Sequence, residues 1–208
     1  MSSSASALRR ARHDPRETEQ EILAAAEQLL RERPFREVTV AQIMLRTGLK
    51  RPAFYAHFSD LHDLVLRLFG DIGEELFEMA DRWLHGSDPA RDVRAALEGI
   101  AAVYRSHGPF LQALADAAPT DERVETAYRS LLQAFVEATA ERIRTDQATG
   151  TVAADVDASE TARALVWGTE RYLSEAFGRS PTDDLGPALD VLRRIWLATL
   201  YPQASRAG

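Results

Sequence analysis

One stretch of the chain, residues 35–69, constrains the fold more than any other. It reads FREVTVAQIMLRTGLKRPAFYAHFSDLHDLVLRLF and predicts a short helix, a tight turn, a second short helix and the start of a longer one. Thr39 and Gln42 have the spacing of a capping box, in which each side chain bonds a backbone N–H at the helix start. Gly48 stands where a sharp turn needs a residue free to adopt positive φ. Pro52 suits a first helical turn, because it has no N–H to leave unpaired there.

Two short helices joined in this way form a helix-turn-helix, which places its second helix in the major groove of DNA. That helix is expected at about 51–58 and leads with its N-terminal residues. The residues predicted to face the bases or the adjoining phosphates are Lys50, Arg51 and Ala53. The residues predicted to contact phosphates are Thr39, Tyr55 and His57.

The same stretch resembles the DNA-binding signature of TetR-type transcriptional regulators. The family pattern is T-x-x-x-I-x-x-x-x-G-x-S-x-x-x-x-Y-x-x-F-x-x-K-x-x-L, and this chain matches it at Thr39, Ile43, Gly48, Tyr55, Phe58 and Leu64. Two positions depart from it, since Lys50 replaces a capping Ser and Leu61 replaces a Lys that contacts a phosphate. The resemblance implies an all-α fold of about nine helices. A three-helix DNA-binding unit would precede a helical ligand-binding and dimerisation bundle.

Helical periodicity continues along the rest of the chain. Helices are predicted at about 15–32, 60–84, 90–107, 109–117, 121–148, 157–178 and 187–201, with His107-Gly108-Pro109 as a break between two of them. No alternating strand pattern of useful length occurs. The expected division is a disordered basic tail over 1–14, a helix-turn-helix DNA-binding domain over 15–60, and a ligand-binding and dimerisation domain over 61–208. The arginines of the tail would contact DNA as an arm or stay solvated.

Composition limits the function classes. The 208 residues include no cysteine, which excludes disulfides, thiolate metal sites and cysteine nucleophiles. The five histidines lack metal-ligand spacing, and no phosphate-binding glycine loop or G-x-S-x-G motif occurs, so no enzyme activity, metal or cofactor is expected. No apolar run is long enough for a membrane span and no secretion signal is recognisable, so a cytoplasmic protein is expected. Residues 1–70 carry a net charge of +2 and the remainder −9, as expected if one end meets DNA.

The C-terminal part resembles one branch of the same family, that of the mycobacterial ethionamide-resistance regulators. The segments ALVWGTERYLSEAFG and LDVLRRIWLATLYP carry this likeness. In that branch the two final helices pair across a two-fold axis, and an apolar channel receives hydrophobic ligands. Both helices here offer more apolar surface than one packed face requires. The predicted homodimer interface consists of Leu165, Leu173, Leu189, Leu192 and Leu197.

Aromatic side chains gather on several of the predicted body helices. Such stripes are either plain core or the wall of a ligand cavity, and the sequence leaves both readings open. The residues predicted to line a cavity are Tyr104, Phe110, Leu114, Tyr128, Leu131, Phe135, Trp167, Thr169, Glu170 and Trp196. Few of them are polar, so a hydrophobic small-molecule effector is expected. Its binding should quench Trp167 and Trp196, with Trp83 responding less.

These observations predict a transcriptional regulator, and specifically a repressor. It would bind a palindromic double-stranded DNA operator as a homodimer and be released by its effector. One alternative is a DNA-binding regulator of the same fold that has no small-molecule ligand, and ligand-dependent release from DNA would separate the two. Another is an interaction protein with a degenerate DNA-binding unit, which would show no salt-sensitive DNA binding.

Overall fold

A computed structural model describes residues 14–177, 184 and 186–205 of the chain. Within these residues it contains nine α-helices, two short 3-10 helices and no strand, so the predicted all-α fold is confirmed. The α-helices are α1 (Pro15–Glu32), α2 (Val40–Thr47), α3 (Arg51–Tyr55), α4 (Leu61–His85), α5 (Pro89–Ala117), α6 (Glu122–Ala148), α7 (Ala158–Phe177), α8 (Gly186–Leu200) and α9 (Pro202–Ser205). The 3-10 helices are η1 (Phe35–Glu37) and η2 (Ala118–Thr120). Residues 1–13, and with them almost all of the predicted basic tail, lie outside the described part.

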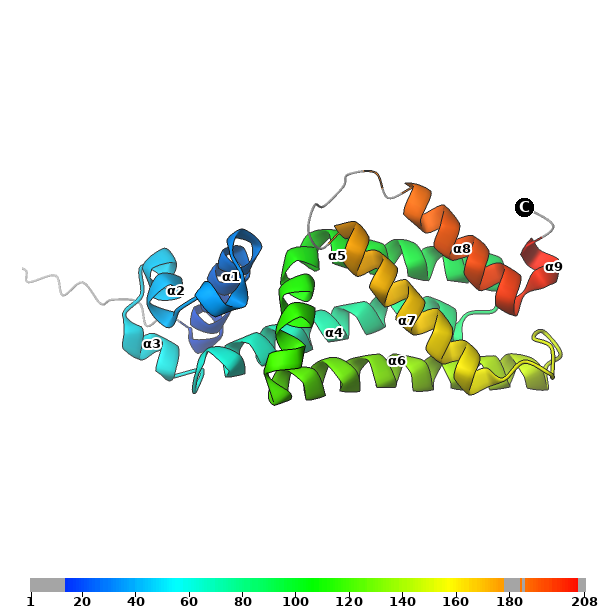
Figure 1. Ribbon diagram of the computed structural model, residues 1–208, viewed down its shortest axis with the longest axis horizontal. Coiled ribbons are helices and arrows are strands. Elements are labelled where there is room, and N and C mark those ends of the chain that lie inside the picture. The colour runs from blue at the N-terminus through cyan, green and yellow to red at the C-terminus, as the bar shows by residue number, and fades with distance from the viewer. Residues whose placement is uncertain (1–13, 178–183, 185, 206–208) are drawn as a thin grey trace, which may run out of the picture.

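Helices α1, α2 and α3 form a small unit at one end of an elongated molecule, and the remaining helices form the body (Figure 1). Helix α4 starts beside the small unit and runs through the body, roughly alongside α6 (Figure 1). Its buried face, which includes Leu64, Leu68, Ile72 and Leu76, belongs to one hydrophobic core that extends from α1 to α8. Because α4 packs in both parts, a movement of this helix would displace side chains in both.

Most helix starts follow from local sequence signals. The capping box of α2 is present, with Thr39 and Gln42 bonding each other's backbone N–H groups. Gly48 ends α2 at φ 68°, a left-handed conformation that glycine adopts without strain. Carboxylates accept bonds from backbone N–H groups at the starts of four other helices: Asp14, Asp60, Asp88 and Asp121.

Helix α5 differs from the prediction. The expected break at 107–109 does not end the helix, which continues through Pro109 to Ala117. Instead the ribbon of α5 changes direction sharply along its length (Figure 1). Pro109 has no N–H to donate to the preceding turn, and proline bends helices for this reason. Gly108 lets α7 approach closely, because a Cβ there would lie 2.5 Å from the carbonyl oxygen of Phe177.

Two smaller observations complete the fold. Helix α3 ends at Tyr55 and a turn follows, so it is shorter than the expected 51–58. None of the described helices is both long enough and apolar enough to cross a lipid bilayer.

Candidate DNA interface and effector cavity

Helix α3 is anchored on one side and open on the other. Phe54 is fully buried and packs against the ring of Phe58, which fixes the helix on the core. Lys50 and Arg51 lie exposed at its N-terminus. Tyr55 is also exposed, and its hydroxyl accepts a 3.2 Å bond from the guanidinium of Arg51. The exposed surface of α3 is therefore basic and aromatic, which suits a phosphate-lined groove.

The other predicted DNA contacts are distributed less simply. Thr39 is exposed at the start of α2, and His57 is half-buried after α3. Ala53 is also half-buried and packs on the core, so little of it remains for a base contact. Leu45 was not predicted, yet it is 83% exposed on α2. Leu45 directly follows the buried residues Ile43 and Met44, so the apolar pattern of α2 does not mark it as exposed.

The body encloses an apolar cavity with about 90 Å³ of free space. Its wall combines side chains from α4, α5, α6, α7 and α8. Seven of the ten residues predicted to line a cavity lie on it: Tyr104, Tyr128, Leu131, Phe135, Thr169, Glu170 and Trp196. Helix α4 contributes Phe69, Leu76, Ala80, Trp83 and Leu84.

Three predicted lining residues lie elsewhere. Phe110 and Leu114 border a separate, smaller hollow beside α1 and η1, because the second part of α5 follows the bend. Trp167 points outward and is exposed on α7. Trp83, which was expected to stand apart, lines the cavity and meets Trp196 edge to face with ring centroids 5.2 Å apart. The expected contrast between the tryptophans is therefore reversed, since Trp83 is close to the cavity and Trp167 is not.

The polar groups of the cavity centre on Glu170. Its carboxylate is buried and accepts a 2.6 Å hydrogen bond from the Ser174 hydroxyl and another from the Tyr128 hydroxyl. Burial, and then the charge of Glu170, raise the pKa of both Tyr104 and Tyr128, so both phenols stay neutral. The indole N–H of Trp196 donates to the hydroxyl of Thr169, the residue before Glu170, at 2.9 Å.

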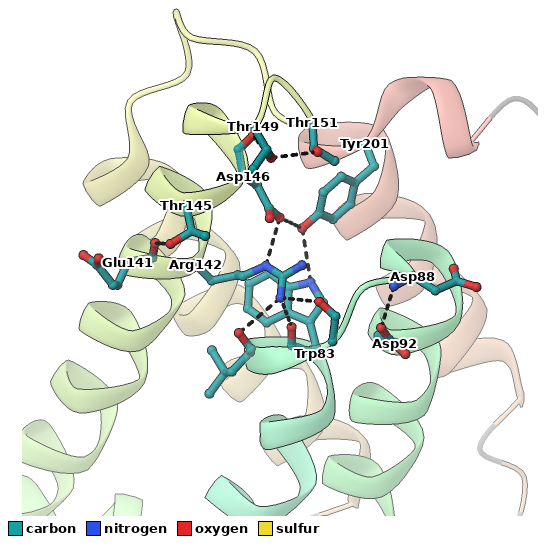
Figure 2. A network of polar contacts seen from close by, with 12 residues as sticks. Trp83, Asp88, Asp92, Glu141, Arg142, Thr145, Asp146, Thr149, Thr151 and Tyr201 are labelled. Carbon is teal, nitrogen blue, oxygen red and sulfur yellow. Dashed lines mark hydrogen bonds and ion pairs between the residues drawn. The ribbon is translucent and has the colours of Figure 1, made fainter.

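A polar network at the far end of the body joins α4, α6 and Tyr201, which lies between α8 and α9 (Figure 2). Arg142 on α6 donates to three carbonyl oxygens at the end of α4, those of Trp83, Leu84 and Gly86, at 2.8–3.1 Å. Its Nε also pairs with Asp146 at 3.0 Å. The Tyr201 hydroxyl donates to Asp146 and accepts from the indole N–H of Trp83 at 3.3 Å. We call these four side chains, Trp83, Arg142, Asp146 and Tyr201, the distal clamp.

A second polar cluster joins the DNA-binding unit to the body. His107 on α5 contacts Glu27 of α1 at 2.5 Å and Glu75 of α4 at 3.4 Å. Arg31 of α1 donates to the carbonyl oxygen of Ser106. The hydrogen bond with Glu27 raises the pKa of His107. Burial alone would raise the pKa of Glu27, but its bonds with His107 and Arg31 outweigh this effect and lower it.

The predicted dimer leucines are mostly internal. Leu165, Leu173, Leu192 and Leu197 are buried within the subunit, and Leu189 is half-buried. These leucines therefore offer little surface to a partner subunit in the described conformation. The large apolar side chains that α7 and α8 leave exposed are Trp167, Tyr172, Val191 and Ile195.

The helix-turn-helix with its exposed basic helix, mounted on a helical body that encloses a cavity, defines a class of protein: a transcriptional regulator that binds DNA. Residues 22–68 match the family described as "Bacterial regulatory proteins, tetR family". Residues 93–202, more than half of the chain, match "Transcriptional regulator EthR, C-terminal domain". The chain belongs to the TetR family of bacterial regulatory proteins and has an EthR-type C-terminal domain. These proteins are regulators and not enzymes.

Curated relatives agree with this assignment. The chain is 28% identical over 198 residues to the HTH-type transcriptional regulator EthR of Mycobacterium tuberculosis (strain ATCC 25618 / H37Rv), covering 93% of this chain and 91% of that protein. It is 28% identical over 141 residues to the HTH-type transcriptional repressor BepR of Brucella suis, covering 62% of this chain and 68% of that protein. Among solved structures, Salmonella enterica GusR has the same fold, with a TM-score of 0.76 at 19% identity over 90% of this chain and 97% of that one.

Proposed function

We propose that this regulator is a homodimeric repressor that leaves a palindromic operator when a hydrophobic small molecule enters the body cavity. One observation carries the proposal. Helix α4 begins beside the DNA-binding unit (Figure 1) and supplies five side chains to the cavity wall. A ligand that moves this wall would therefore also move the DNA-binding unit. A DNA partner implies that the protein works in the cytoplasm.

The size of the cavity supports coupling between ligand and DNA. Sites for drug-sized molecules enclose roughly 300–1,000 Å³. The free space here is about 90 Å³, so a ligand of that size must push the walls apart. The described conformation would then differ from the ligand-bound one. A ligand shifts an equilibrium only through its different affinity for two states, and such a difference is built into a cavity that has to open.

The proposed dimer surface is the exposed face of α7 and α8, in place of the leucines expected from the sequence. Val191 and Ile195 lie one turn apart on α8, and Trp167 lies exposed on α7. A Cβ on Gly168 would meet open space, so a partner helix could approach closely there. Two-fold symmetry would place two copies of α3 about one DNA turn apart, which is the reason to expect a palindromic operator.

The small free space also favours a second candidate, a regulator of the same fold that responds to no small molecule. In that case the aromatic side chains would simply fill the core. The two candidates differ in what a ligand does to DNA affinity, since only the first predicts release.

The test begins with selection of DNA from a random duplex library by the full-length protein. The expected result is a palindromic sequence with half-sites about one turn apart, whose affinity falls when Arg51 is replaced by Ala. Arg36→Ala is a matched control, because Arg36 is exposed on η1, before the helix-turn-helix begins. Hydrophobic compounds that change tryptophan fluorescence are then added to the complex. Tight fluorescence-detected binding with unchanged DNA affinity would favour the second candidate, and selection of no sequence would count against both.

A further inference from the structure

We propose that the effector is a hydrophobic organic cation whose charged group pairs with Glu170, and that it reaches the cavity from an acidic groove between α4 and α6. This inference rests on the proposed function, because it assumes that the body cavity is the effector site. It adds the charge of the ligand and the direction from which the ligand arrives.

The carboxylate of Glu170 is buried in the cavity wall and favours a cationic ligand. Glu170 is only 7% exposed and lies on a wall that is otherwise almost entirely apolar. Its partners, Ser174 and Tyr128, are neutral hydroxyl donors, and no basic side chain of the described residues forms an ion pair with it. The neighbouring Arg171 pairs instead with Glu175 on the outside of α7. A buried charge is normally compensated by an opposite charge, and here that charge is left for a ligand to bring.

A groove adjoins the cavity and offers a route into it. It is an open depression of about 1380 Å³ between α4 and α6. Phe69, Leu84 and Leu131 line both the groove and the cavity. Phe77 of the groove stacks on Phe135 of the cavity, with ring centroids 3.9 Å apart. The two spaces therefore share part of one wall, and the proposed entry is by displacement of these shared side chains.

The groove is lined by more acidic than basic residues. Its acidic residues are Glu74, Glu78, Asp81 and Glu122. The groove has two basic residues, and both are engaged, since Arg123 pairs with Asp60 and His85 pairs with Asp81. A cleft lined by one sign of charge raises the local concentration of the opposite ion and speeds its association.

Together these features select one ligand class. The apolar floor of the groove and the aromatic cavity favour a hydrophobic skeleton, while the rim and Glu170 favour a positive group. A carboxylic acid such as a fatty acid would place a second negative charge beside Glu170, which is unfavourable at short range. A neutral compound would leave the carboxylate uncompensated.

The test uses three probes with the same skeleton: 4-phenylbutylamine, 4-phenylbutan-1-ol and 4-phenylbutanoate. At pH 7 they are positive, neutral and negative. Binding to the full-length protein is measured by calorimetry. A charge-assisted hydrogen bond with Glu170 should make the amine bind about tenfold more tightly than the alcohol, with the carboxylate weakest. Glu170→Gln should abolish the preference for the amine. Glu141→Gln is the matched control and should retain it, because Glu141 is exposed and pairs with Arg144.

A second variant tests the route. Replacing Glu74, Glu78 and Glu122 by Gln should slow association of the amine and weaken its dependence on salt, while the preference for amine over alcohol persists. Equal association rates in this variant and the wild type would overturn the route.

The outcomes separate this inference from the function on which it rests. If wild-type protein binds amine and alcohol equally and both release DNA, the preference for a cationic effector is refuted and the proposed regulatory function is retained. If the amine is preferred but DNA affinity is unchanged, the cation site stands and the regulatory role is lost. Binding of none of the probes would overturn the cation site. The wild-type comparison requires no variant, so it remains decisive even if Glu170→Gln folds poorly.

Discussion

Replacing Arg142 by Met tests whether the distal clamp holds the end of α4. The side chains of Arg142 and Asp146 are only 10% and 8% exposed, so this pair is buried. Removing one member of a buried ion pair costs about 3–5 kcal/mol, because the other charge is left uncompensated. Met retains most of the apolar length of the arginine, so the loss should come from polar contacts. We therefore expect the free energy of unfolding to fall by about 3 kcal/mol or more.

The measurement is urea unfolding, followed by far-UV circular dichroism. Arg144→Met is the matched control, because Arg144 lies on the same helix but is exposed and pairs with Glu141 on the surface. Surface ion pairs contribute about 0–1 kcal/mol, so this variant should unfold almost as the wild type does. Asp146→Asn and the double variant complete a cycle that isolates the coupling between the two charges. Equal losses for Arg142→Met and Arg144→Met would refute the idea that the clamp holds α4.

Three further predictions concern DNA, the dimer and pH. Lys50→Ala should weaken operator binding by roughly 1–3 kcal/mol if the lysine reads a guanine. If it contacts only phosphate, affinity should fall for all DNA sequences, and the slope of log affinity against log salt concentration should drop by about one. Unchanged binding to both specific and random DNA would exclude both roles. Ile195→Arg should give folded monomers in sedimentation, because Ile195 is 48% exposed, whereas Leu192→Arg should destabilise the subunit itself. A tight dimer for Ile195→Arg would place the interface elsewhere. The raised pKa of His107 means that its bond with Glu27 stabilises the fold fully below about pH 6.5 and less as pH rises through the raised value. Urea unfolding across this range should show that dependence in the wild type and not in His107→Gln, and identical pH profiles would contradict it.

The sequence predicted best those features that depend on neighbouring residues. The capping box of Thr39 and Gln42 and the left-handed Gly48 each involve residues within four positions along the chain. Such short-range signals are independent of the rest of the fold. Glu170 was also expected on a cavity wall, and its side chain lies there.

The errors occurred where distant segments meet. The sequence around Gly108 suggests a break, but α5 continues through Pro109, and Gly108 lies in close contact with Phe177 of α7. Helices α7 and α8 have apolar residues on two faces, and periodicity does not tell which face lies inside. Leu192 was therefore assigned outward and Ile195 was overlooked.

The distal clamp shows a related limit. Arg142 and Asp146 have the spacing of an ordinary surface pair on a helix, so nothing local marks them as buried. Their third partner, Tyr201, lies 55 residues further along the chain. Only the tertiary fold, which brings the end of α8 beside α4 and α6, places the three together.

The distal clamp makes α4 a lever with a fixed end. The helix has 25 residues, so at about 1.5 Å per residue it is roughly 37 Å long. The clamp holds one end and the DNA-binding unit is attached to the other, with the cavity wall between them. A rotation of about 5° around the clamped end would displace the other end by roughly 3 Å, and two-fold symmetry would double the change in spacing. A ligand that widens the cavity by less than the diameter of one atom would thus put two recognition helices out of register with a DNA turn of about 34 Å.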